Sequence, residues 1–334
     1  MRLALKLERR KGVDPTQGRD PKLMYGSQSA TKKVTVPELR ARKSTLLGSP
    51  ELAPKIAMVT AYDYTMARLA DEAGMDMVLV GDSLAMVVQG LNTTIPVTLD
   101  EMAYHCRVVA RGLTRAHLVG DLSFMSYQVS SAQAVESAGK LMKDGAESIK
   151  LEGGQEIAEH AYRIVRVGIP VVGHIGLTPQ SVHAFGGFKV QGRGEGADKI
   201  MADAIALEQA GAFAIVLEAI PPDLAADITS MLTVPTIGIG AGAHCDGQVL
   251  VCSDLLGLSR GHQPKFAKRF ANLGDAAVNA FSAYVQEVRA GTFPAAAHAY
   301  KANAQSAAAQ SERRPPISAS GDELDAPLAL DRWH

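Results

Sequence analysis

Residues 131–154 read SAQAVESAGKLMKDGAESIKLEGG, and this stretch contains the unit that decides the fold. Ser131–Lys143 repeats its apolar residues at intervals of three and four, which predicts a helix packed on one face. Gly145 stands where that helix should stop, because glycine adopts a left-handed C-cap most easily. The apolar run Ser148–Leu151 follows. The stretch therefore predicts a helix that leads into a buried strand of a parallel sheet.

The same unit recurs along the chain. Helices are expected at Ile157–Val167 and Lys199–Ala210, and Gly74, Gly168 and Gly211 stand at further helix ends. The strand-like runs are Lys55–Thr60, Met77–Gly81, His117–Gly120, Ser148–Leu151, Val171–Gly173, Phe213–Leu217 and Pro235–Ile239. Strands that alternate with helices predict a parallel sheet covered on both faces. Seven clear units, with an eighth expected around Leu256–Gly261, favour a closed (β/α)8 TIM barrel over an open doubly wound sheet.

The two ends of the chain differ from this pattern. Residues 1–33 are polar, with turn-forming Gly and Pro, and residues 302–334 run from Ala, Ser and Gln into a Pro-rich segment. Such composition buries too little apolar surface to offset the entropy of ordering. We therefore expect a flexible N-terminal extension over 1–33, a barrel catalytic domain over 34–301 and a disordered C-terminal tail over 302–334.

Composition narrows the class of protein. The 334 residues carry a formal net charge of −1, so no overall field points to nucleic acid or to an anionic membrane. The three cysteines form no CxxC pair, which argues against a disulfide framework or a thiolate zinc site. No apolar run reaches the ~20 residues that span a bilayer, and the first thirty residues lack the apolar core of a secretory signal. The expected location is the cytoplasm.

Polar residues that could do chemistry stand at the C-terminal edges of the apolar runs. In a (β/α)8 barrel these edges converge on one rim, where active sites are built. A series of such residues therefore predicts a site at that rim. The series consists of Tyr62, Asp82, Ser83, Asp121, Lys150, Glu152, His174 and Glu218.

Each of these residues also has a plainer interpretation. A single carboxylate at a strand end is more often a helix N-cap, which could apply to Asp82 or Asp121. His174 alone could be a core histidine. Lys150 and Glu152, however, are two residues apart on one strand and so point to the same face, where unpaired buried charge would be costly. Several carboxylates at one rim suit a hard, oxygen-binding cation, for which Mg2+ is the default.

Two glycine-rich segments could suggest nucleotide binding. The segment FGGFKVQGRG at 185–194 lacks the GK[ST] ending of a phosphate-binding loop, and we expect a mobile loop over the site. The segment GIGAG at 238–242 lacks GxGxxG spacing, so close packing of strand against helix explains it better than dinucleotide binding.

Taken in order, the motifs resemble those of a known family. They are Thr60-Ala-Tyr-Asp63, Val80-Gly-Asp-Ser-Leu84, Asp121 with Phe124-Met125, Ile149-Lys-Leu-Glu-Gly-Gly154, Gly173-His-Ile-Gly-Leu-Thr-Pro-Gln180, the 185–194 segment and Ile237-Gly-Ile-Gly-Ala-Gly242. Over about residues 33–297 the chain resembles the ketopantoate hydroxymethyltransferase family. The resemblance implies a barrel of the phosphoenolpyruvate/pyruvate superfamily that commonly assembles as a homodecamer.

The resemblance also implies a reaction, the first committed step of pantothenate synthesis. The family transfers a hydroxymethyl unit from 5,10-methylenetetrahydrofolate to 2-oxoisovalerate, giving ketopantoate with the help of Mg2+. By motif position it implies Asp82, Asp121 and Glu152 as metal-binding residues and Glu218 as the general base. The implied substrate-binding residues are Tyr62, Asp82, Ser83, Asp121, Lys150 and His174.

Two other functions stay open at this point. A carbon–carbon lyase of the same superfamily would usually need a catalytic cysteine in its mobile loop, and residues 185–194 contain none. A non-catalytic barrel that binds keto acids would have to carry the rim acids and Lys150 without a catalytic use. Turnover of 2-oxoisovalerate, with and without the folate, would discriminate among the three.

Overall fold

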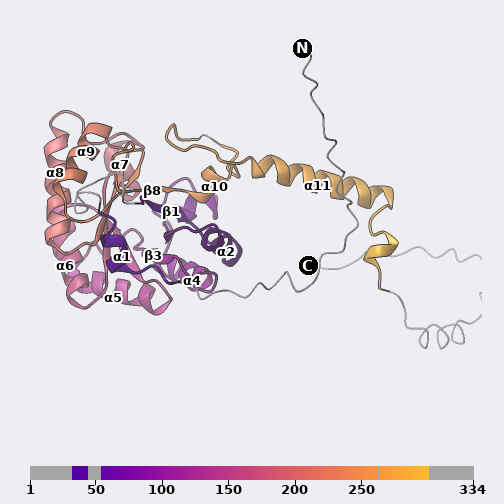
Figure 1. The fold of residues 1–334 in the computed structure, drawn as a ribbon, viewed down its shortest axis with the longest axis horizontal. Coiled ribbons are helices and arrows are strands. Elements are labelled where there is room, and N and C mark those ends of the chain that lie inside the picture. The colour runs from indigo at the N-terminus through magenta and orange to yellow at the C-terminus, as the bar shows by residue number, and fades with distance from the viewer. Residues whose placement is uncertain (1–31, 44–53, 262, 301–334) are drawn as a thin grey trace, which may run out of the picture. The chain divides into compact units, whose positions relative to one another are not determined.

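A computed structural model describes residues 32–43, 54–261 and 263–300 (Figure 1). Contacts divide the chain into one unit that ends at Gly274 and a second that begins at Asp275. Within the second unit, the described elements are α11 (Leu273–Ala290), which starts at the boundary, and η5 (Ala296–His298). Apart from Lys32 and Lys33, the expected flexible extension and disordered tail lie outside the described residues.

The first unit contains a closed barrel of eight parallel strands in sequence order, which confirms the expected (β/α)8 fold. β8 closes the ring by pairing with β1, with Ile56 opposite Gly247. The strands are β1 (Ile56–Thr60), β2 (Met77–Val80), β3 (His117–Asp121), β4 (Ser148–Glu152), β5 (Val171–Gly176), β6 (Ala214–Glu218), β7 (Thr236–Ile239) and β8 (Gly247–Leu250).

Helices cover the outside of this barrel (Figure 1). The longer ones are α2 (Tyr64–Glu72), α4 (Leu99–Ala110), α5 (Ser131–Lys143), α6 (Ala158–Arg166), α8 (Gly196–Gln209) and α9 (Pro222–Met231). The shorter ones are α1 (Val36–Arg40), α3 (Leu84–Val87), α7 (Val182–Phe185), α10 (Cys252–Leu255), η3 (Gln155–Ile157) and η4 (Pro179–Ser181). None of the described helices is long and apolar enough to cross a membrane.

The unit at 131–154 folds as its sequence predicts. Ser130 caps α5 by accepting a hydrogen bond from the Gln133 amide, and the helix covers Ser131–Lys143. Gly145 then turns the chain with a φ of 102°, and every residue of β4 is buried. The three other glycines expected at helix ends, Gly74, Gly168 and Gly211, also have positive φ.

The expected position of the eighth strand, Leu256–Gly261, is wrong. β8 lies earlier, at Gly247–Leu250, and the chain then forms α10 and a turn. The reason lies in close packing, because a Cβ on Gly247 would lie 2.7 Å from the Ile56 carbonyl oxygen. β8 begins with this required glycine and exposes Gln248. Its sequence therefore lacks the continuous apolar run by which the other strands were predicted.

The N-terminal end of the barrel is closed by the segment around α1. Leu39 is fully buried and packs in the cluster of side chains that fills the barrel interior. Just after α1, the Lys43 ammonium lies 2.9 Å from Asp246 Oδ2 and also donates to the Thr229 carbonyl. Both charged side chains are fully buried. Because Asp246 directly precedes β8, this ion pair marks the end of the barrel opposite the rim.

Candidate active site

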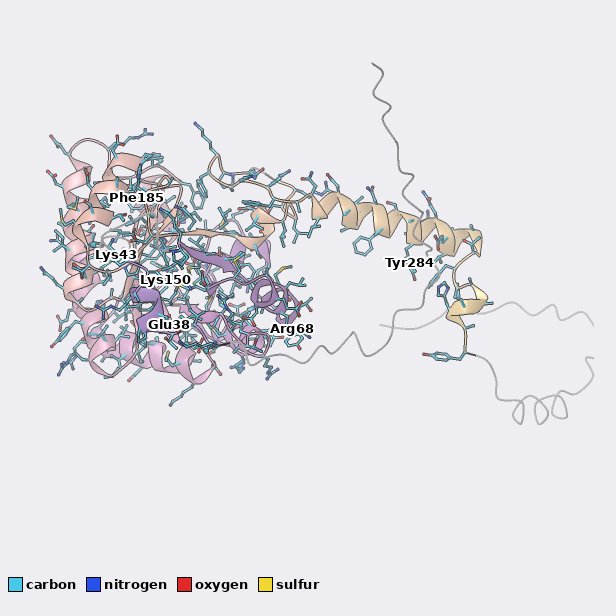
Figure 2. All side chains as sticks on the ribbon, viewed as in Figure 1. Glu38, Lys43, Arg68, Lys150, Phe185 and Tyr284 are labelled. Atoms are coloured by element: carbon cyan, nitrogen blue, oxygen red, sulfur yellow. The ribbon has the colours of Figure 1, made fainter. Side chains whose placement is uncertain are left out.

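The structure places the eight expected side chains at the C-terminal ends of six strands. Asp121, Lys150, Glu152, His174 and Glu218 lie within the last residues of β3, β4, β5 and β6, whereas Tyr62, Asp82 and Ser83 follow the ends of β1 and β2. The adjacent register of these strands aligns Asp121 with Lys150 and Glu152 with His174. Figure 2 labels Lys150 among the side chains of the barrel.

Lys150 is the centre of a buried group of charges. Its ammonium lies 2.9 Å from Asp121 Oδ1 and 3.6 Å from Glu152 Oε1. Burial lowers the pKa of Lys150, but the carboxylates of Asp121, Glu152 and Asp82 outweigh that effect and raise it. Lys150 is therefore a permanent cation, and the expectation that Lys150 and Glu152 share one face is confirmed.

His174 joins this group to Glu218. Its Nδ1 lies 3.2 Å from Glu152 Oε1, and its Nε2 lies 3.1 Å from Glu218 Oε2. Burial and Lys150 lower the pKa of His174, but the two carboxylates raise it to about 9. Lys150 Nζ is also 3.1 Å from Nδ1. If both ring nitrogens are protonated, Nδ1 has no lone pair and cannot accept a hydrogen bond from Lys150. Carboxylates flank both nitrogens, and they hold the ring in its protonated form.

Asp82 and Asp121 lie side by side at the other edge of the group. The backbone amide of Asp82 donates to Asp121 Oδ2 over 3.0 Å. Burial, together with the charges of Asp121 and Glu152, raises the pKa of Asp82 well above its usual value. Burial also raises the pKa of Asp121, with Lys150 acting in the opposite direction. The one ammonium of Lys150 therefore does not offset the mutual repulsion and burial of these two carboxylates.

Tyr62 and Ser83 form a separate polar pair beside Asp82. The Tyr62 hydroxyl and Ser83 Oγ lie 2.8 Å apart. Burial raises the pKa of Tyr62, so its hydroxyl remains protonated at neutral pH. Ser83 occupies the N-cap position of α3 without a side-chain capping bond. Its hydroxyl is thus engaged toward the rim instead of the helix.

The plainer interpretation as helix caps applies to a neighbour and not to Asp82. Asp63 caps α2 by accepting from the Met66 amide. Asp82 instead accepts from the Gln180 side-chain amide, and Asp121 contacts Lys150. His174 is not an isolated core histidine, because both of its ring nitrogens face carboxylates.

The charges of the group fit a divalent cation. Four carboxylates, those of Asp82, Asp121, Glu152 and Glu218, face only two cations, Lys150 and His174, which leaves two negative charges when all ionise. Asp121 Oδ1 and Glu152 Oε1 are buried and form ion pairs with Lys150 and His174, but neither accepts a well-aligned hydrogen bond from the described residues. The described residues include no group of three His, Cys, Asp or Glu side chains arranged as a complete metal site.

The sequence did not single out Gln180 and Tyr127. The Gln180 side chain donates to Asp82 Oδ2, and its backbone amide donates to Glu152 Oε2. Tyr127 contacts Gln180 and the backbone of Glu152. Gln180 ends the GLTPQ motif, but neutral side chains in loops give no charge signal that would mark them as part of a site.

The two glycine-rich segments have different surroundings. A Cβ on Gly242 would lie 2.7 Å from Pro222 Cβ at the start of α9, so close packing explains the 238–242 turn as expected. In the 185–194 segment, the Gln191 amide donates to the Ala219 carbonyl directly after β6. That bond places the segment beside Glu218, and its mobility stays a prediction.

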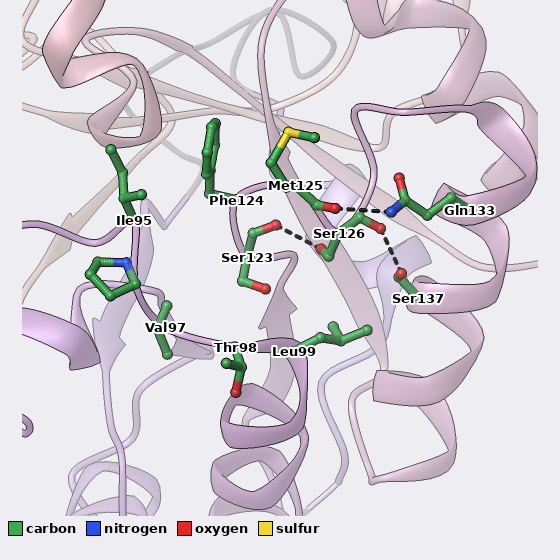
Figure 3. A pocket seen from close by; sticks show the side chains of 11 residues that line it. Ile95, Val97, Thr98, Leu99, Ser123, Phe124, Met125, Ser126, Gln133 and Ser137 are labelled. Carbon is green, nitrogen blue, oxygen red and sulfur yellow. Dashed lines mark hydrogen bonds between the residues drawn. The ribbon is translucent and has the colours of Figure 1, made fainter.

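A pocket of about 470 Å³ opens next to the end of β3 (Figure 3). Several polar groups in its wall bond to one another, including Ser137 Oγ with the Ser126 carbonyl and Gln133 Nε2 with the Met125 carbonyl. Phe124 and Met125, both exposed, line it. None of the eight rim residues expected from the sequence lines it, so this pocket is a neighbour of the charged group and not part of it.

Comparison with known proteins places this geometry in a family. The family model described as ketopantoate hydroxymethyltransferase matches residues 33–296. The 3-methyl-2-oxobutanoate hydroxymethyltransferase of Anaeromyxobacter sp. strain K is 57% identical, over 80% of this chain and 88% of the relative. That of Syntrophus aciditrophicus is 52% identical, over 82% of this chain and 99% of the relative.

Solved structures with much lower identity share the fold. Phosphonopyruvate hydrolase, in complex with oxalate and Mg2+, has a TM-score of 0.51 at 13% identity, covering 82% of this chain and 95% of that one. This second likeness bears on the fold alone. The family model and the close relatives, however, each span about four-fifths of the chain, and the chain therefore belongs to the ketopantoate hydroxymethyltransferase family.

Proposed function

We propose that this chain transfers a hydroxymethyl unit from 5,10-methylenetetrahydrofolate to 3-methyl-2-oxobutanoate (2-oxoisovalerate), giving ketopantoate, the first committed step of pantothenate synthesis. In the balanced reaction the folate supplies the new carbon and water supplies the hydroxyl oxygen, while tetrahydrofolate is released. Family membership supports the choice of substrates. The observation that carries the proposal is the continuous charged group that runs from Glu218 through His174, Glu152 and Lys150 to Asp121.

Mg2+ belongs to the proposal because the residues fit it. Asp82, Asp121 and Glu152 would hold the ion, since together they supply the negative charge that Lys150 and His174 do not balance. When bound, the ion would act as a Lewis acid that stabilises negative charge on the carbonyl oxygen of a 2-oxo acid. Tyr62, Ser83, Lys150 and His174 are then the groups available to bind and orient the substrate.

Glu218 is proposed to remove the proton from C3 of 2-oxoisovalerate. It ends β6, is only partly buried, and so remains accessible to a substrate at the rim. The charged ring of His174, 3.1 Å from Oε2, fixes the orientation of the carboxylate. As the proton leaves, negative charge moves toward the carbonyl oxygen, where Lys150 and His174 provide fixed positive charge. The resulting enolate attacks the one-carbon unit of the folate.

The alternative lyase reaction receives less support. Such an enzyme would usually use a cysteine in its mobile loop, and residues 185–194 have none. All three cysteines are free and buried, and burial raises the pKa of each thiol. A thiol of raised pKa is a poor nucleophile or acid at neutral pH.

The proposal extends to partners and location. The expected partners are the two small molecules and further copies of the chain, as a homo-oligomer such as a decamer, with neither nucleic acid nor membrane. A homo-oligomer would suit α11, whose Phe281, Tyr284 and Val288 are exposed. The proposed location is the cytoplasm, which suits a chain with three unpaired cysteines.

Deuterium exchange at C3 of 2-oxoisovalerate tests the proposal most directly. In deuterated buffer, proton NMR should show loss of the C3 signal with enzyme and Mg2+ alone, and ketopantoate should form only when methylenetetrahydrofolate is added. Chelation of Mg2+ by EDTA should stop both processes. Binding of the keto acid without exchange would instead identify a non-catalytic barrel, and release of a carbon fragment without the folate would identify a lyase.

A further inference from the structure

We infer that Gln180 is a positioning residue that holds one oxygen of Asp82 and one of Glu152, so that the second oxygen of Asp82 is directed to the cation and that of Glu152 stays beside His174. This inference rests on the proposed function, because the cation belongs to that function. It assigns a role to a neutral residue that makes no proposed contact with substrate.

The hydrogen bonds of Gln180 fix the orientation of its side-chain amide. Nε2 donates to Asp82 Oδ2 over 3.0 Å and to the Leu122 carbonyl over 2.8 Å. Oε1 lies 2.8 Å from the Tyr127 hydroxyl, whose one proton it shares with the Glu152 carbonyl, and it accepts from Gln128 Nε2 over 3.1 Å. The reversed amide would set oxygen against two acceptors. All four hydrogen-bonding positions of this amide are therefore used in one orientation only.

The backbone of the same residue holds a second carboxylate. The Gln180 amide N–H donates to Glu152 Oε2 over 3.0 Å from the short helix η4, which begins at Pro179. The third carboxylate is held in the same way, because the Asp82 N–H donates to Asp121 Oδ2. Each carboxylate thus has one oxygen bound by a neutral amide. An amide donor orients a carboxylate but carries no positive charge, so it does not neutralise the negative charge that would attract the metal ion.

The network also joins the loops that carry the site. Gln180 follows β5, Asp82 follows β2, Leu122, Tyr127 and Gln128 follow β3, and Glu152 ends β4. Gln180 and its partners are buried, apart from the partly exposed Gln128. A loss of the Gln180 side chain should therefore free Asp82 to rotate, while the backbone bond to Glu152 remains.

Gln180→Met tests this role, because methionine has a similar shape and no amide donor. Mn2+ binding to the metal-free protein, followed by electron paramagnetic resonance, measures the site without turnover. Loss of a group that orients a metal ligand typically lowers metal affinity ~10–100-fold. We expect that decrease for Gln180→Met, with the rate of C3 exchange largely restored at saturating Mg2+. Gln180→Asn keeps an amide but is one methylene shorter, so its Mn2+ affinity should fall as well.

Tyr127→Phe is the matched control. It removes the hydroxyl that contacts Gln180 Oε1 and both backbone groups of Glu152, but leaves the Asp82 bond in place. It should lower the melting temperature with less than a ~3-fold change in Mn2+ affinity. If the Gln180 variants lower only the melting temperature and bind Mn2+ like the wild type, Gln180 is merely structural and the inference is wrong. A wild-type protein that binds neither Mn2+ nor Mg2+ would overturn the proposed function, and this inference with it.

Discussion

His117 and His174 are both buried inside the barrel, but they lie toward opposite ends and have opposite pKa shifts. His117 begins β3, bonds to Ser148 Oγ, and has a pKa that burial lowers to about 4. At the rim, burial also lowers the pKa of His174, but Glu152 and Glu218 raise it to about 9. Both rings are equally buried, but His117 is neutral and His174 is charged. The difference comes from the carboxylates of Glu152 and Glu218, which contact both nitrogens of His174.

The same contrast extends to the rest of the interior. The side chains near α1 and the strand beginnings are mainly apolar, and among the described residues they include a fully buried ion pair, Lys43 with Asp246. The rim has more carboxylates than cations, with four carboxylates around Lys150 and His174. We interpret the α1 end of the barrel as stabilising the fold and the rim as binding charge. Substitutions at either end test this interpretation.

The largest expected effect comes from Glu218→Gln at the rim. The variant keeps the size of the side chain but removes its basicity, so C3 exchange and hydroxymethyl transfer should fall together by ~10²–10⁴-fold. NMR exchange and ketopantoate formation measure the two rates. Glu147→Gln, near the other end and beside His117, is the control and should keep both. If transfer collapses while exchange continues at the wild-type rate, Glu218 acts later and another group is the base.

The next effect is on stability, at the closed end. Lys43→Met leaves Asp246 buried without its ammonium, and breaking a buried pair by removing one partner costs about 3–5 kcal/mol. Urea unfolding should show this loss, while the exchange rate at 25 °C stays at the wild-type value. Lys55→Met, which removes bonds to the Ala243 and Cys245 carbonyls only, should cost less. Equal losses in the two variants would contradict the importance of the buried pair.

The two histidines should respond to pH in opposite directions. For His117 the folded pKa lies below the unfolded one, so its contribution is complete above pH 6.5 and is lost as the pH falls through about 4, by about 3 kcal/mol. For His174 the folded pKa is raised, so its contribution is complete below pH 6.5 and is lost as the pH rises through about 9. Urea unfolding of metal-free His117→Gln and His174→Gln, each compared with wild type across this range, checks both signs. If the two variants changed stability with pH in the same direction, the two histidines would not have opposite pKa shifts.

The smallest expected effect distinguishes the two aspartates. Asp82→Asn and Asp121→Asn should each weaken Mg2+ binding by about 10-fold or more, or ~1.4 kcal/mol, as measured by calorimetric titration. Without metal, however, Asp82→Asn should leave the melting temperature unchanged or slightly raised, because it relieves like-charge repulsion. Asp121→Asn should lower it, because Lys150 loses the carboxylate at 2.9 Å. A variant that titrates with Mg2+ like the wild type would contradict its assignment as a ligand.

The sequence predicts best where one physical signal dominates. The alternation of apolar runs with periodic helices predicted seven strands and the barrel, and the charged residues at strand ends predicted the members of the rim group. β8 was missed because close packing on Ile56 requires glycine there, which removes the apolar run. Gln180 and Lys43 were missed for a different reason. Their roles depend on partners far away in the sequence, such as Asp82 and Asp246, that only the folded chain brings together.

The buried pair at the closed end also has a consequence for synthesis on the ribosome. Lys43 and Asp246 are separated by 203 positions in the sequence. At translation rates of ~5–20 residues per second, the lysine emerges roughly 10–40 s before its partner has been made. During that interval the α1 segment has neither the ion pair nor the ring closure between β1 and β8. The segment that closes the barrel is therefore among the first of the described residues to be synthesised and among the last that can dock.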